Sequence, residues 1–80
     1  MKVVDAAFSY IGDADFWEGL ATFDDGATHN FTACRDGAVL LQTHFRLSRA
    51  AEFGVRIWRS PEREKAIRKF FSIAEPKKST

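Results

Sequence analysis

The sequence predicts an α+β domain, a small antiparallel sheet built on a β-hairpin and packed by a C-terminal amphipathic helix. Two observations carry this prediction: a strong turn signal between strand-like runs within residues 16–34, and an apolar stripe of helical period after residue 60. The length of 80 residues indicates one domain, which we assign to residues 1–75. Residues 76–80 are expected to form a flexible basic tail, because Pro76 would end the helix and polar residues follow it.

The N-terminal half is expected to contain three strands joined by acidic turns. Residues 2–11 alternate loosely between apolar and polar side chains, which favours a strand, and residues 12–15 are typical of a turn. A second strand is predicted at 16–23 and a third at 27–34. Asp24-Asp25-Gly26 joins them with the strongest turn signal of the chain, because Asp tolerates positive φ and Gly favours it. One face of the second strand carries Trp17, Gly19, Ala21 and Phe23, and one face of the third carries His29, Phe31 and Ala33.

The middle of the chain allows two interpretations. Asp36-Gly37 could turn a second hairpin into a strand at 39–45, or Asp36 could cap a helix with Ala38, Leu41 and Phe45 on one face. Residues 48–53 are predicted to form a short helix that Gly54 ends, with an extended segment at 55–58 after it. A competing helical stripe consists of Leu47, Ala50, Ala51, Gly54 and Trp58.

The C-terminal helix has the clearest signals. Ser60 is a good N-cap, and Pro61 suits the first helical position, where no backbone N–H is needed. Glu62 and Glu64 favour the first turn, and Glu64 forms an i,i+4 pair with Arg68. Arg63 occupies the third helical position, so the usual capping box is absent. The predicted apolar stripe is Ala66, Ile67, Phe70, Phe71 and Ala74, and the residues expected to face water are Arg63, Lys65, Arg68, Lys69 and Ser72.

The order of features along residues 16–72 also bears on the fold. A strand with Trp17 leads to an Asp-Gly turn, a strand that ends near Cys34, the segment Asp36-Gly37-Ala38-Val39-Leu40 and a closing helix over 62–70. This order resembles a family of small bacterial domains of unknown function, in which a β-hairpin precedes a helical C-terminal half. The stretch 46–60 departs from that pattern. The resemblance implies a helix at 37–45 and no activity.

Several classes of protein are disfavoured by composition. A lone cysteine, Cys34, cannot form an internal disulfide, which favours a cytoplasmic location over a secreted one. The N-terminus has no apolar leader, and no apolar run approaches ~18 residues, so we expect neither a signal peptide nor a membrane association.

Catalytic and metal-binding patterns are weak. His29, His44 and Cys34 lack the paired short spacing and the fourth ligand of a structural zinc site. His29 and Cys34 are five positions apart on one predicted strand, so their side chains should point to opposite faces. We therefore expect no enzyme, catalytic residue, metal, cofactor or small-molecule substrate.

Charge divides the chain into two halves. Residues 1–34 hold one cation, Lys2, against six carboxylates, whereas residues 35–80 hold eleven cations against five carboxylates. An acidic docking patch would form if the predicted turns fell on the same side of a meander. Its members would be Asp13, Asp15, Glu18, Asp24 and Asp25.

The arginines are the best candidate binding residues. Arg suits bidentate contact with phosphate or carboxylate, and Trp58 is placed to stack between two of them. The set is Arg46, Arg49, Arg56, Trp58, Arg59 and Arg63.

The aromatic content favours a protein interface. The eight Phe, two Trp and one Tyr exceed what so small a core obviously needs, and exposed aromatics beside Arg are typical of interfaces. We therefore predict a small non-enzymatic interaction or regulatory module with a protein partner or self-association. A phage or mobile-element inhibitor or an accessory subunit would fit. The alternative is a nucleic-acid-associated accessory protein that binds through its arginines.

Overall fold

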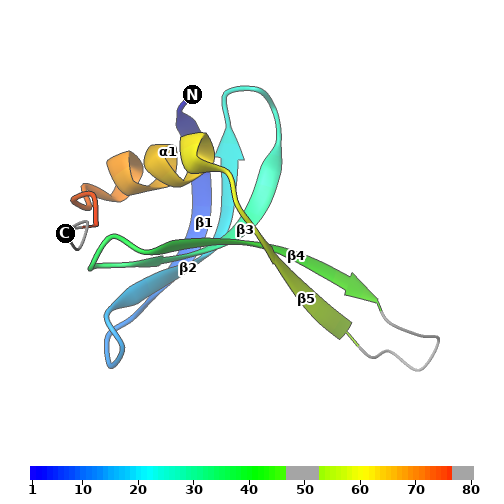
Figure 1. The fold of residues 1–80 in the computed structure, drawn as a ribbon, viewed down its shortest axis with the longest axis horizontal. Coiled ribbons are helices and arrows are strands. Elements are labelled where there is room, and N and C mark those ends of the chain that lie inside the picture. Colours follow the sequence, from blue (N-terminus) through cyan, green and yellow to red (C-terminus); the bar gives the residue numbers. More distant parts are fainter. Residues whose placement is uncertain (47–52, 77–80) are drawn as a thin grey trace.

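A computed structural model describes residues 1–46 and 53–76 of the chain. One helix and one antiparallel sheet make up this part, and the strands lie in the sheet in the order of the sequence. Figure 1 shows the helix across one face of the sheet and the last hairpin extending away from it. The elements are β1 (Val3–Ile11), β2 (Phe16–Phe23), β3 (Thr28–Cys34), β4 (Val39–Arg46), β5 (Phe53–Trp58) and α1 (Pro61–Phe71). The α+β prediction is confirmed, with a larger sheet than the predicted hairpin alone requires.

The central hairpin forms as the sequence predicts. β2 pairs with β3 without a register shift, from Phe16 opposite Cys34 to Thr22 opposite Thr28. Gly26 has a φ of 87°, the conformation for which glycine is suited. The Gly26 N–H donates to the carbonyl of Phe23 at 2.9 Å and closes the turn.

The core lies between α1 and one face of the sheet. Ile67 and Ala66 are the buried apolar residues of the helix, and Ile67 is completely shielded from solvent. The prediction of the apolar stripe is wrong at two positions. Phe70 is 42% exposed, and Ala74 lies beyond the end of the helix. The buried apolar residues of the sheet are Ala21, Phe23, Phe31, Ala33, Val39 and Leu41.

The start of α1 has a reciprocal cap that the sequence did not predict. Ser60 accepts a hydrogen bond from the Arg63 N–H at 3.4 Å, as an N-cap should. The carboxylate of Glu64 accepts from the Ser60 N–H at 2.9 Å. In a capping box the residue at the third helical position accepts from the N-cap N–H, and here Glu64 makes that bond from the fourth position.

The end of α1 lies earlier than predicted. Ser72 adopts the left-handed conformation, with a φ of 56°, and its N–H donates to the carbonyl of Lys69 at 3.2 Å. The Ile73 N–H donates to the carbonyl of Arg68 at 2.8 Å. These bonds satisfy the carbonyls of Arg68 and Lys69 and end the helix before Pro76 is reached, so the prediction that Pro76 ends it is wrong. Residues 77–80 of the predicted tail at 76–80 lie outside the described part of the chain.

The segment after β3 is a hairpin. Asp36 accepts from the Ala38 N–H at 3.0 Å, and Gly37 has a φ of 103°. The Cys34 N–H donates to the carbonyl of Ala38 at 2.8 Å, which returns the chain to β3 as β4. The strand interpretation of residues 39–45 is therefore confirmed, and the helix at 37–45 that the resemblance implies is wrong.

Gly54 continues a strand where a break was predicted. It lies inside β5 opposite Phe45, so neither the break at Gly54 nor a helix that reaches Phe53 is correct. The extended segment at 55–58 is confirmed. A Cβ atom on Gly54 would lie 2.6 Å from the Phe45 ring, which occupies the space of the missing side chain. Residues 48–52 of the predicted short helix lie outside the described part of the chain.

Gly19 is a position where β1 and β2 approach closely. A Cβ atom there would lie 2.0 Å from the carbonyl oxygen of Ala7 and 2.7 Å from the Cα atom of Phe8. We expect Gly19→Ala to push the strands apart and lower the free energy of unfolding by about 1–3 kcal/mol. Gly12→Ala is the matched control, because its new Cβ would meet only the Tyr10 ring at 3.7 Å. Urea denaturation of both variants tests this, and equal losses would contradict it.

Candidate protein-interaction surface

The acidic residues do not gather into one patch. The β1–β2 turn and the β2–β3 turn lie at opposite ends of β2, because consecutive turns of a meander alternate between its ends. The predicted acidic docking patch is therefore wrong.

Each turn instead holds a carboxylate that pairs with an arginine. Asp15 accepts from Tyr10 Oη at 2.6 Å and from Arg35 Nε at 2.9 Å, and these bonds lower its pKa. Asp25 accepts from both terminal nitrogens of Arg63, and this contact holds the pKa of Asp25 at about 2. The opposite charges of the two halves of the chain thus partly meet within the fold.

The arginines of the predicted set have different surroundings. Arg63 joins α1 to the β2–β3 turn, and its guanidinium lies 4.8 Å from the centre of the Phe23 ring. The prediction that Arg63 and Arg68 face water is wrong, because their side chains are only 17% and 12% exposed. Arg59 remains exposed but donates to the buried carboxylate of Glu64 at 3.0 and 3.1 Å.

Arg56 is the member of this set that stays on the surface without a carboxylate partner among the described residues. Its guanidinium lies 5.7 Å from the centre of the exposed Phe45 ring, a cation–π contact across β4 and β5. The backbone of Arg46 belongs to β4, and nothing is described of its side chain. Arg49 lies outside the described residues. The arginines therefore do not form one continuous row in the described chain.

Trp58 belongs partly to the core. It is half-buried, and its ring lies 4.8 Å from the imidazole of His29 in an edge-to-face arrangement. Its indole Nε1 is buried and has no hydrogen-bond partner within the described part of the structure. Burial lowers the pKa of His29, and the charge of Arg63 adds to this effect.

No metal site or nucleophile pair emerges from the described residues. Groups of three or more His, Cys, Asp or Glu that could hold a metal do not occur in that part of the chain. His29 lies on the helix side with Phe23 and Trp58, and Cys34 follows the opposite alternation along β3. Burial raises the pKa of the Cys34 thiol, which disfavours the reactive thiolate.

β5 presents the surface that the sequence did not reveal. It is an edge strand, and Figure 1 shows the β4–β5 hairpin extending away from α1. Its side chains alternate between the two faces of the sheet, and Arg56 and Trp58 lie on the helix side. The other face carries Phe53, Val55 and Ile57, which we call the β5 strip. Their side chains are exposed by 69%, 52% and 48%.

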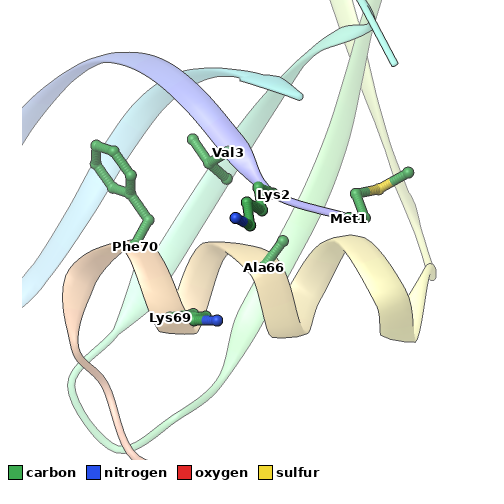
Figure 2. Close-up of a pocket in the computed structure, with 6 residues that line it drawn as sticks. All are labelled: Met1, Lys2, Val3, Ala66, Lys69 and Phe70. Carbon is green, nitrogen blue, oxygen red and sulfur yellow. The ribbon is translucent and has the colours of Figure 1, made fainter. Parts of the chain in front are cut away.

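The opposite edge of the sheet is built differently. The pairing of β1 with β2 shifts register between Val3 and Asp5, and an irregular edge is a poor template for another strand. α1 lies beside the start of β1, and between them is a shallow hollow of about 240 Å³ (Figure 2). Its lining is Met1, Lys2, Val3, Ala66, Lys69 and Phe70. The two edges thus differ: β5 pairs regularly, and none of the residues described in 1–46 and 53–76 pairs with its outer side.

The sequence carried one signal for this edge. Residues 55–58 were expected to be extended, but an assumed helix before Gly54 hid the length of the strand and its edge position.

None of the helical structure in the described residues has the length and hydrophobicity needed to cross a bilayer. Comparison of the chain with protein-family models, curated proteins and solved structures finds no match. The resemblance to small bacterial domains therefore stays a prediction.

Proposed function

We propose that this protein is a non-enzymatic interaction module that binds another protein chain through the β5 edge. The carrying observation is that β5 lacks the usual protection of an edge strand. It contains no proline or lysine, its pairing with β4 has no register shift, and α1 leaves it open (Figure 1).

The chemistry of the edge suits strand addition. A strand of the partner would pair with the free backbone groups of β5, and main-chain hydrogen bonds would supply affinity. The β5 strip would select apolar side chains on one face. Arg56 would add a positive charge on the other face, beside the Phe45 ring. Such a module would act as an inhibitor or as an accessory subunit, by occupying an edge of its target.

The test is capture of partners from a lysate of the source cells by the wild type and two variants. Val55→Lys places a charge on the β5 strip and should abolish capture with a nearly unchanged melting temperature, because exposed substitutions usually change stability by within about 0.5 kcal/mol. Val4→Lys is the matched control, since Val4 is 60% exposed at the opposite edge. Unchanged capture by Val55→Lys would contradict the proposal.

The same experiment separates the nucleic-acid alternative. Binding to nucleic acid through the arginines would disappear after nuclease treatment and weaken steeply with salt. It would be lost in Arg56→Glu and retained in Val55→Lys, whereas strand addition requires the Val55 position. That hypothesis stays a prediction until this comparison is made.

A further inference from the structure

We infer that the β5 edge pairs with β5 of a second copy of this chain, in an antiparallel register centred on Val55. This inference rests on the proposed function, since it names the occupant of the same edge. A symmetric dimer would join the two sheets into one continuous sheet with a twofold axis perpendicular to it.

The symmetry limits the registers that β5 can adopt. A twofold axis perpendicular to the sheet passes midway between the two copies of one residue and keeps the same face of both sheets on the same side. Centring on Gly54 or Ile57 would pair only three β5 residues of each copy, whereas centring on Val55 or Arg56 pairs five. The choice therefore lies between Val55 and Arg56.

Side-chain chemistry decides between these two registers. Centring on Arg56 places two guanidinium groups directly opposite each other, which is destabilising. Centring on Val55 places Val55 opposite the partner's Val55 and Phe53 opposite the partner's Ile57. The β5 strips of both copies, exposed in the single chain, would then form one apolar row of cross-strand pairs.

Gly54 supplies a second argument for the Val55 register. In this register, Arg56 lies opposite the partner's Gly54, a position without a side chain. The space above Gly54 is filled by the ring of Phe45 within each copy. Arg56 would therefore approach the partner's Phe45, and the cation–π contact now seen at 5.7 Å within one chain would gain a counterpart between chains.

Engineered cysteines test the register directly. In a Cys34→Ser background, Val55→Cys should form a disulfide-linked dimer under mild oxidation, because directly opposed Cα atoms lie ~4.5–5.5 Å apart, within disulfide range. Ile57→Cys in the same background is the matched control. Its copies would be offset by four residues along the strand, roughly 13 Å, which is too far for a disulfide. The double variant Phe53→Cys/Ile57→Cys should cross-link again.

Sedimentation equilibrium of the wild-type chain completes the test. One strand pair gives a smaller interface than the standard ~800 Å² per partner, so we expect a weak dimer whose fraction rises with concentration and falls in Val55→Lys. Equal cross-linking at positions 55 and 57, or a wild type that stays monomeric, would overturn the inference. A monomeric wild type whose capture of another protein is lost in Val55→Lys would overturn the dimer alone. If Val55→Lys also leaves capture unchanged, the proposed function fails as well.

Discussion

Replacing Phe31 with alanine is expected to unfold most of the protein at 25 °C. Phe31 is 1% exposed on the middle strand of the sheet, and its ring centre lies 5.6 Å from that of Phe71. Removing a buried phenyl ring costs about 3–5 kcal/mol, which is comparable with the whole stability of a domain this small. Urea denaturation followed by circular dichroism measures the loss.

Phe70→Ala provides the control for this experiment. The sequence placed Phe70 in the apolar stripe, but its side chain is 42% exposed and contacts Phe8 at the sheet edge. We expect a loss of about 1–2 kcal/mol, in proportion to the smaller area removed from water. A Phe70→Ala variant as unstable as Phe31→Ala would show that the aromatic cluster at β1 carries more of the fold than its exposure indicates.

Glu64→Ala should give the second large effect, a loss of about 2–3 kcal/mol. Glu64 is 1% exposed, and its carboxylate accepts from Arg59 and from the Ser60 N–H. Its removal leaves the Ser60 N–H without this partner at the start of α1. The cost stays below that of breaking a fully buried ion pair for two reasons. The Arg59 side chain is 73% exposed and can return to water, and Arg68, 3.9 Å from the carboxylate, keeps its bonds to the Gly37 carbonyl and Glu75. Glu62→Ala, in the same turn but exposed, is the control and should cost only a few tenths of a kcal/mol.

The stabilisation by Glu64 should also depend on pH. The hydrogen bonds from Arg59 lower the pKa of Glu64 below its usual value, so the folded state favours the charged carboxylate. The stabilisation is fully present above the unfolded pKa, about 4.3, and is lost as the pH falls through the lower folded pKa. The difference in melting temperature between wild type and Glu64→Ala should therefore shrink in acid. A constant difference from pH 7 to pH 3 would contradict the assigned role.

The sequence predicted those elements whose local signals agree. Asp25-Gly26 between strand-like runs and Ser60-Pro61 before an apolar stripe each allow one structure, and both elements formed. Residues 37–45 were ambiguous because Ala38, Leu41 and Phe45 satisfy a helical period, while residues 39–45 also fit a strand. The prediction at Gly54 was wrong because the Phe45 ring fills the space beside this glycine within the strand. The pairing of β4 with β5 places that ring there, although Phe45 lies nine positions earlier in the chain.

The candidate surface was less predictable, for topological reasons. Whether two acidic turns meet, or whether a strand lies at an edge, depends on the order of strands in the sheet. Arg63 was predicted to lie on a binding surface, but its guanidinium pairs with Asp25, 38 positions earlier, and joins α1 to the β2–β3 turn. The local sequence around either residue does not indicate that the two side chains meet. The exposure of the β5 strip likewise follows from topology, because its residues lie on the face of the sheet that α1 does not cover.

The neighbour-to-neighbour order of the strands has a kinetic consequence. Each strand pairs with the one that follows it in the chain, so sheet formation never requires the closure of a long loop. Because the entropic cost of closing a loop grows with its length, this order favours assembly of the sheet by successive hairpin addition. α1 comes last in the chain, and its long-range tie to the β2–β3 turn joins positions that the finished hairpins have already brought near. During synthesis on the ribosome the sheet can assemble from its N-terminal end, and the helix then closes over a surface already in place.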